Sequence, residues 1–290
     1  MHPLYDAVRW WSFIIPPIVC PFEFIINAPF GRFAPSSAGI FVVDGIKSWI
    51  VMELVSPISF LYALTRSPLA SSLADVGPLT GPQLFLAGLF LVHYANRALV
   101  SPLRTPSRSK SHIVVPLSGA CFNLVNGTLM GTYIGSSDAA AFLTGAFGRL
   151  SFWTGITLWL VGFCGNILHD EVLLNIRRNA KAKGKAKAAG DPSKNQKEHY
   201  AIPHGYLYKY LSYPNYFCEW SEWFGFALAA SPLPPMTSLS AIAHTIQPPW
   251  LFFLAEVFLM IPRAYRGHRW YHETFPDYPK ERKAVIPFIF

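Results

Sequence analysis

The chain is a series of long apolar runs separated by short polar or basic segments. Most of the runs are close to the roughly 20 residues that a helix needs to cross a bilayer. Several contain Pro or Gly, which neighbouring helices accommodate in a membrane bundle. The pattern therefore predicts an all-α membrane protein, a seven-transmembrane-helix bundle, with spans near residues 10–28, 40–64, 83–100, 113–135, 151–174, 216–231 and 246–262.

Composition supports this interpretation. Of the 290 residues, 52% are hydrophobic, 16% are aromatic and only 14% are charged, whereas soluble domains usually carry about a quarter of charged residues. The net charge of +8 comes from basic residues that lie between the apolar runs. Membrane topology explains that placement better than nucleic-acid binding does.

The distribution of Lys and Arg predicts the orientation. Twenty of the 24 lie in the first, third and fifth loops and in the C-terminal tail. By the positive-inside rule, the N-terminus is then outside or lumenal and the C-terminus is cytosolic. We expect one integral-membrane domain over 1–290, with a flexible, basic cytosolic loop at 178–199 and a cytosolic tail at 263–290. Residues 1–45 are expected to hold a first span and no removable signal, because Pro16 and Pro17 interrupt the run.

Several common chemistries are not supported. The four cysteines are far apart and form no CxxC pair, which argues against a disulfide framework and a metal site. No G-x-G-x-x-G follows an expected strand, and no P-loop, G-x-S-x-G or H-E-x-x-H motif occurs.

Glu53 lies inside the apolar stretch "WIVMELV". An ionisable residue in a span is a functional-site hypothesis by default; the alternative is a carboxylate that snorkels or caps a helix. Tyr94, in "LVHYANR", lies at a comparable depth if the two helices are antiparallel. A tyrosine alone is usually an interfacial belt residue. Together, a carboxylate that accepts a hydrogen bond from the phenol would orient it toward an oxygen that gains negative charge.

A second polar stripe follows in the fifth run, where Asn166, Asp170 and Arg177 recur at spacings of 4 and 7 and so share one helical face. Such a stripe favours a ligand path, although the amide and the carboxylate could satisfy one another and the arginine could be a snorkelling anchor. The sixth run holds Glu219 and Glu222, which indicates that its outer half lines a polar cavity. The tail is basic and aromatic, which suits phosphates and a stacked ring or, alternatively, an ordinary amphipathic surface.

From about Trp49 to the last residue, the chain resembles the steroid 5α-reductase family, the NADPH-dependent 3-oxo-5α-steroid 4-dehydrogenases of the endoplasmic reticulum membrane. The resemblance is carried by "HYANR", "GNILHD", "YAIPHGYLYKYLSYPNYFCEWSEWFGFAL" and "RWYHETFPDYPKERKAVIPFIF". Residues 1–45 match only in being apolar. The resemblance implies a multi-pass, seven-helix bundle that encloses NADPH and a lipid substrate, a 3-oxo-Δ4-steroid.

The resemblance also implies roles for individual residues. Tyr94 and Glu53 would bind the C3 carbonyl as the catalytic pair, and Trp49 and Phe122 would contact the substrate. Gly267 stands where the family has histidine, so the pattern departs around "RGHRW". The implied cofactor-binding residues are Asn166, Asp170, Arg177, Tyr200, Asn215, Glu219, His268 and Tyr271.

The expected reaction is hydride transfer to the β-carbon of an enone with stabilisation of the enolate oxygen, the proton donor for the α-carbon being open. The alternatives are reduction of an enoyl thioester or a polyprenol-type lipid, a methyltransferase, and a sterol-binding protein without turnover. The methyltransferase is disfavoured because its motif has histidine where this chain has Tyr213. The expected partners are the lipid substrate and membrane lipid, without nucleic acid or an obligate protein partner.

Overall fold

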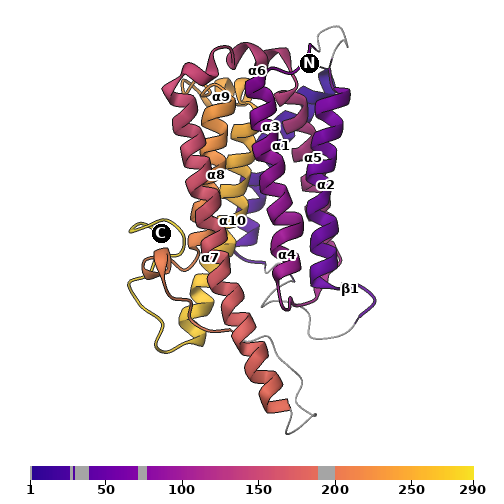
Figure 1. Ribbon diagram of the computed structural model, residues 1–290. Helices are drawn as coiled ribbons and strands as arrows, with labels where there is room; N and C mark the ends of the chain where they lie inside the picture. Colours follow the sequence, from indigo (N-terminus) through magenta and orange to yellow (C-terminus); the bar gives the residue numbers. More distant parts are fainter. Residues whose placement is uncertain (1, 27–28, 30–38, 71–76, 189–199) are drawn as a thin grey trace.

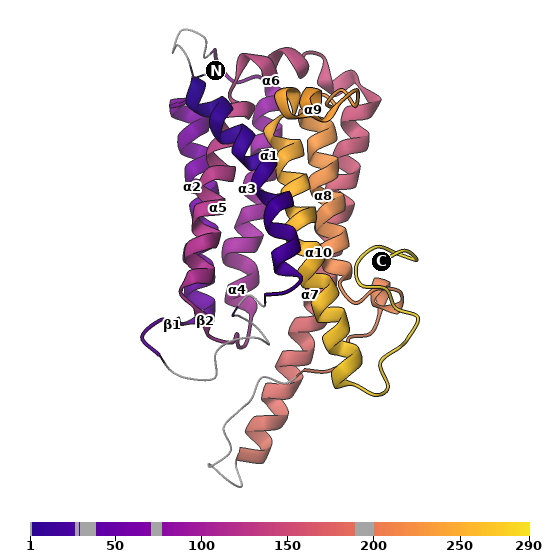
Figure 2. The ribbon, with the colours of Figure 1, turned by 180° about the vertical axis from the view of Figure 1, so that it is seen from behind.

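Long helices run side by side through the molecule (Figures 1 and 2). The computed structural model describes residues 2–26, 29, 39–70, 77–188 and 200–290. Within these ranges, the seven helices of 15 or more residues overlap the seven apolar runs of the sequence. They are α1 (Pro3–Glu23), α2 (Gly45–Arg66), α3 (Gly81–Ala95), α5 (Val114–Ile134), α7 (Leu150–Ala188), α8 (Pro214–Ala230) and α10 (Pro248–Thr274).

The predicted number of seven membrane spans is not confirmed. Four described helical segments are long and apolar enough to cross a membrane, and the bent pair of α9 (Leu239–Thr245) and α10 would make a fifth. Among the others, α8 has only 17 residues and carries two glutamates, and α1 holds Asp6 and Glu23. The described helices therefore indicate a multi-pass membrane protein with four or five such spans.

Two helix pairs pack closely enough for their backbones to touch. Between α2 and α5, a Cβ added at Gly131 would lie 2.3 Å from the carbonyl oxygen of Phe60. Between α7 and α8, a Cβ added at Gly225 would lie 2.5 Å from the carbonyl oxygen of Gly155. Small residues permit this approach, and dispersion replaces the hydrophobic driving force that is weak in lipid. The remaining long helices join the pairs: α3 contacts α2 and α5, and α10 contacts α8, α5 and α1.

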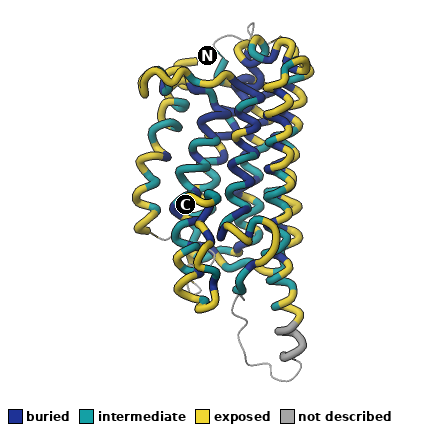
Figure 3. The backbone as a smooth tube through the Cα atoms, turned by 90° about the vertical axis from the view of Figure 1, so that its left-hand side faces the viewer, coloured by how far each residue is buried: buried dark blue, intermediate teal, exposed yellow. Residues whose placement is uncertain are grey.

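An aromatic layer fills the space between the two pairs. Phe60 and Phe90 stack with ring centroids 4.2 Å apart, Phe90 meets Trp223 edge-on at 5.9 Å, and Trp223 meets Phe252 of α10 at 4.5 Å. Aromatic pairs of this kind are favourable beyond the area they bury. Figure 3 shows the buried positions along the inner helix faces and the exposed positions on the outer faces.

Short elements close the ends of the bundle. Strands β1 (Val42–Val43) and β2 (Ser111–His112) form an antiparallel pair. A π-helical turn, η3 (Asn96–Val100), and α4 (Ser101–Arg104) follow α3. The remaining short helices are α6 (Ser137–Phe142), η4 (Ala146–Gly148) and η5 (Tyr206–Lys209).

The segment expected to be a flexible loop is helical in its first half. Helix α7 continues to Ala188, well past the apolar part of its sequence, because Lys and Ala are strong helix formers. The rest of the segment, 189–199, lies outside the described residues. The C-terminal tail runs back against the chain that precedes α8: Ser212 N donates to the Lys283 carbonyl at 2.9 Å, and Tyr213 N donates to the Ala284 carbonyl at 3.0 Å.

Candidate functional site

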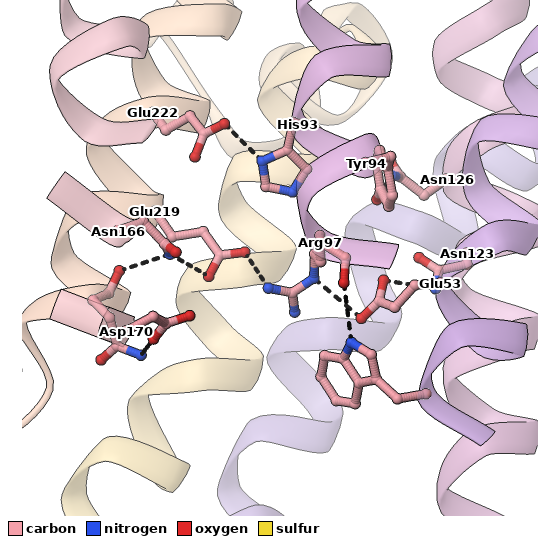
Figure 4. Close-up of polar contacts among 12 residues, drawn as sticks. Glu53, His93, Tyr94, Arg97, Asn123, Asn126, Asn166, Asp170, Glu219 and Glu222 are labelled. Atoms are coloured by element: carbon pink, nitrogen blue, oxygen red, sulfur yellow. Dashed lines mark hydrogen bonds and ion pairs between the residues drawn. The ribbon is translucent and has the colours of Figure 1, made fainter. Parts of the chain in front are cut away.

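Arg97 connects the two close helix pairs (Figure 4). It lies in the π-helical turn η3, an irregularity that occurs frequently at functional sites. Its Nε donates to Glu53 Oε1 of α2 at 3.1 Å, and its Nη1 donates to Glu219 Oε1 of α8 at 2.8 Å. Both glutamate side chains are 4% exposed. One guanidinium thus pairs with two buried carboxylates from opposite sides of the bundle.

On the α2–α5 side, Glu53 and Tyr94 are both buried, but they do not pair as predicted. Among the described residues, Glu53 accepts from Arg97 and, through Oε2, from Asn123 Nδ2 at 3.3 Å. The Tyr94 hydroxyl accepts from Asn126 Nδ2 at 3.4 Å. The expected Tyr94–Glu53 hydrogen bond is not present among the described residues, where Glu53 instead accepts a charge-assisted bond from the guanidinium. Glu53 and Tyr94 nevertheless lie on the same side of the Arg97 guanidinium, opposite Glu219 (Figure 4).

On the α7–α8 side, four of the expected cofactor residues form one hydrogen-bond chain. Asn166 Nδ2 donates to Glu219 Oε2 at 3.1 Å and to the main-chain carbonyl oxygen of Asn215 at 3.2 Å. Asn215 Nδ2 donates to Asp170 Oδ1 at 3.0 Å. The chain leads from Arg97 to Asp170, so the helical spacing of 4 residues does place Asn166 and Asp170 on the face toward α8.

Two cationic side chains, Arg108 and Arg177, lie near this chain of hydrogen bonds. The Trp49 indole Nε1 donates to the Arg97 carbonyl at 3.3 Å, and the Arg108 guanidinium lies 3.6 Å over the Trp49 ring. Arg108 and Arg177 are close enough to repel each other, and neither forms an ion pair with a described residue. Both groups also attract the Asp170 carboxylate, so one carboxylate faces two positive charges, and this excess positive charge favours an additional anion.

Tyr200 and the expected tail residue Tyr271 belong to a neighbouring aromatic cluster. The Tyr200 ring meets the Trp270 ring edge-on at 5.2 Å, and Tyr271 stacks on Tyr278 with centroids 5.0 Å apart. Phe122, expected on the substrate side, is partly buried on α5 with its ring centroid 6.1 Å from that of Phe252.

His268 and the departure at Gly267 are explained by packing. His268 Nδ1 lies 2.6 Å from Ser212 Oγ, which ties α10 to the chain before α8. A Cβ added at Gly267 would lie 1.7 Å from the Tyr213 hydroxyl oxygen. No side chain fits at position 267 unless Tyr213 moves, so the glycine and the bulky tyrosine complement each other.

Four polar residues of this region were not assigned to the site from the sequence. Arg97 is one of the basic residues of the third expected loop, and it lies one helical turn after His93 in "HYANR". Asn123 and Asn126 are amides spaced by 3 in an apolar run, a signal that was visible in the sequence. His93 Nδ1 lies 2.7 Å from Glu222 Oε1, a pairing that no sequence spacing indicates. The four residues are His93, Arg97, Asn123 and Asn126, whereas Glu222 was expected to line a polar cavity but without a partner.

Comparison with known proteins gives a consistent result. The family model described as 3-oxo-5-alpha-steroid 4-dehydrogenase matches residues 109–290. The chain is 40% identical over 282 residues to an uncharacterized protein of Schizosaccharomyces pombe, covering 93% of this chain and 94% of that one. It is 34% identical over 287 residues to 3-oxo-5-alpha-steroid 4-dehydrogenase 1 of Bos taurus, covering 99% and 97%. It is 33% identical over 264 residues to the Rattus norvegicus protein of the same name, covering 91% and 87%.

A multi-pass helical bundle with a buried polar centre thus carries the sequence features of membrane oxidoreductases that act on CH–CH groups. The chain belongs to the 3-oxo-5-alpha-steroid 4-dehydrogenase family.

Proposed function

We propose that the protein uses NADPH to reduce the C4=C5 double bond of a 3-oxo-Δ4-steroid to the 5α-reduced 3-oxosteroid. The observation that carries this proposal is the position of Arg97, which joins Glu53 on the expected substrate side to Glu219 on the expected cofactor side. Reduction of a conjugated double bond needs a hydride source and an oxyanion-stabilising group next to each other, and one shared side chain places both sets of residues within its reach.

On the substrate side, Tyr94 is the donor to the C3 carbonyl. Its hydroxyl oxygen accepts from Asn126, so its own proton remains available for the substrate. Glu53 acts as a positioning residue. It accepts hydrogen bonds from Arg97 and Asn123, and its negative charge is paired with the Arg97 guanidinium. A hydrogen bond that strengthens as the carbonyl oxygen gains charge favours the transition state over the ground state. Trp49 and Phe122 supply apolar ring contacts to the substrate.

On the cofactor side, the residues present suit a dinucleotide phosphate. Arg108 and Arg177 offer two guanidinium groups without ion-pair partners among the described residues, which fits phosphate oxygens. The chain from Glu219 through Asn166 and Asn215 offers amides and carboxylates to the sugar and nicotinamide amide groups. When bound, NADPH supplies the hydride. The remaining expected cofactor contacts are Asp170 at the end of that chain, Tyr200, and the tail residues His268 and Tyr271.

We further propose that the protein lies in the endoplasmic reticulum membrane with its C-terminus in the cytosol, and that α1, α8 and α10 complete seven spans. The basic distribution supports this orientation. Protease added to sealed microsomes should cut within residues 181–187. Protection of that segment would reverse the orientation.

The proposed reaction is tested with purified protein in detergent or lipid. With NADPH, a 3-oxo-Δ4-steroid should be converted to its 5α-reduced product, whereas a trans-2-enoyl-CoA and a polyprenol should not be reduced. Deuterium from labelled NADPH should appear at C5 of the steroid. Reduction of the thioester or polyprenol in place of the steroid would contradict the assignment.

A further inference from the structure

His93 and Glu222 form a buried pair that the proposed reaction has not yet used. His93 Nδ1 of α3 lies 2.7 Å from Glu222 Oε1 of α8. The two residues are 5% and 0% exposed. His93 precedes Arg97 by one helical turn, and Glu222 follows Glu219 by nearly one turn. The pair is therefore a second connection between α3 and α8, parallel to the Arg97–Glu219 ion pair and deeper in the bundle (Figure 4).

The hydrogen-bonding pattern indicates how this pair is protonated. Glu222 Oε2 is buried and has no hydrogen-bond partner among the described residues. A carboxylate would leave charge on an unpaired oxygen, which is far more costly than burying a neutral carboxylic acid. The nearest guanidinium, Arg97, is already shared by Glu53 and Glu219, so it cannot compensate a third negative charge. Glu222 is thus the acid, and its proton lies on the bond to His93 Nδ1.

The histidine tautomer follows from this assignment. If Nδ1 accepts from Glu222, the single N–H proton of the neutral imidazole is on Nε2. Figure 4 shows the His93 ring between Glu222 and Tyr94, with its second nitrogen directed away from Glu222. The ring centroids of His93 and Tyr94 are 5.1 Å apart, and Trp223 packs on the other side at 4.6 Å. These rings hold the imidazole in place beside the proposed carbonyl donor.

We propose that the His93–Glu222 pair delivers the proton that the substrate's α-carbon requires. This inference rests on the proposed function, in which Tyr94 binds the C3 carbonyl, because the α-carbon C4 is bonded directly to C3. His93 is then a catalytic residue that touches the substrate, and Glu222 is the proton reserve behind it. General acids of this kind typically contribute about 10²–10⁴-fold to a rate.

The proton transfer balances without a further reactant. Hydride addition at C5 leaves a substrate enolate with a C3=C4 double bond. The electrons of that double bond form the new C4–H bond with the Nε2 proton, and the C3 carbonyl is restored. The N–H bonding electrons stay on Nε2, while the Glu222 proton moves to Nδ1. The pair ends as a carboxylate beside a neutral imidazole protonated on Nδ1, and solvent returns one proton before the next turnover.

Removal of a C4 proton from the saturated product is the reverse of this proton transfer, and it provides a test that does not depend on reduction. Wild-type protein with NADP⁺ and the saturated 5α-3-oxosteroid in deuterium oxide should exchange one C4 hydrogen while the C5 hydrogen is retained. His93→Gln keeps a polar group of similar reach but cannot relay a proton. Glu222→Gln keeps the shape and still donates to Nδ1 but holds no acidic proton. We expect both variants to lower C4 exchange and steroid reduction by about 10²-fold or more.

Controls separate this inference from the proposed function. His244→Gln, an exposed histidine of α9, should behave as wild type in both assays. NADPH binding, followed by its fluorescence, should be unchanged in both test variants. Wild-type protein that fails to reduce any 3-oxo-Δ4-steroid would refute the proposed function itself. Two results would overturn the role of the pair if the wild type does reduce the steroid. The variants would either retain C4 exchange or lose NADPH binding as well, and the pair would then be a structural contact.

Discussion

The two close helix pairs differ in how they satisfy a buried carboxylate. In α2–α5, Glu53 has one amide donor, Asn123, and otherwise depends on Arg97. In α7–α8, Glu219 begins a chain of amides that reaches Asp170. Both pairs are packed through glycine contacts that bring backbones together, and neither supplies a cation that pairs with its glutamate among the described residues. A guanidinium from a third helix serves both, and this single side chain sets the position of one half of the site relative to the other.

The two sides of the site also end in side chains of different chemical character. The α2–α5 side leads to rings, where Phe122 faces Phe252. The α7–α8 side leads to Arg177, which lies close to Arg108, whose guanidinium stacks on Trp49 of α2. An apolar wall suits a steroid nucleus and a pair of guanidinium groups suits phosphates, so the difference supports one ligand on each side. Changes at Arg97 should therefore affect both ligands, whereas changes on one side should affect one.

The largest effect is expected for Arg97→Met. It removes the only cation seen to pair with Glu53 or Glu219 among the described residues, and it leaves two buried carboxylates uncompensated. Breaking a buried ion pair by removing one partner typically costs about 3–5 kcal/mol. Thermal unfolding in detergent should show this loss, and KM should rise for both steroid and NADPH.

The matched control is Arg104→Met. Its pair with Glu171 is partly exposed, with side-chain exposures of 45% and 30%, and such pairs are typically worth about 0–1 kcal/mol. A stability of Arg97→Met equal to that of this control would show that the two sides are not joined through Arg97.

Tyr94→Phe should affect only the substrate side. It preserves the ring packing against Phe90 and removes the proton donor for the carbonyl. Losing one preorganised oxyanion donor typically costs about 10²–10³ in kcat, while NADPH fluorescence should report unchanged binding. Tyr133→Phe, which removes a hydroxyl bonded to the Ala230 carbonyl outside the site, is the control. Full turnover in Tyr94→Phe would remove tyrosine from the mechanism.

Arg177→Ala should affect only the cofactor side. A charged hydrogen bond to phosphate is worth roughly 1.5–3 kcal/mol, so KM for NADPH should rise about 10–100-fold while KM for steroid stays constant. Its neighbour Arg178 pairs with Glu171, and Arg178→Ala should leave both constants near the wild-type values. If the two variants behave alike, Arg177 does not contact the cofactor.

The smallest effect is expected for Gly267→Ala, at the contact between α10 and the chain before α8. The added methyl group would collide with the Tyr213 hydroxyl, and overpacking of this kind typically costs about 1–3 kcal/mol. Gly88→Ala, where no atom lies within 4 Å of the added Cβ, is the helix-matched control and should be neutral or stabilising. Tyr213→Phe combined with Gly267→Ala should recover part of the lost stability. Tyr213→Leu, which also removes the ring carbons that the methyl group would meet, should recover more when combined with Gly267→Ala. If neither combination recovers stability, the collision is not the cause of the destabilisation.

Hydrophobic periodicity determined where the long helices lie, because a run of apolar residues has few alternatives to a buried or lipid-facing helix. It did not determine how many of them cross a membrane: α8 is short and carries glutamates, and α1 is charged at both ends. The segment 178–188 was expected to be a flexible loop. Its Lys-Ala sequence has a high helix propensity, and it extends α7.

The candidate site was likewise predicted in part from the sequence and decided in part by the tertiary structure. Spacing along one helix was enough to place Asn166 and Asp170 on a common face, and a carboxylate in an apolar run was enough to mark Glu53. The partner of that carboxylate was decided by tertiary structure, because several polar groups on neighbouring helices compete for each buried oxygen and the strongest donor within reach prevails. Arg97 reached Glu53 where Tyr94 was expected, and Glu222 met His93 from a helix 129 residues further along the chain. Sequence supplied the groups that had to be paired, and only the packing of α3 between the two close pairs selected the partners.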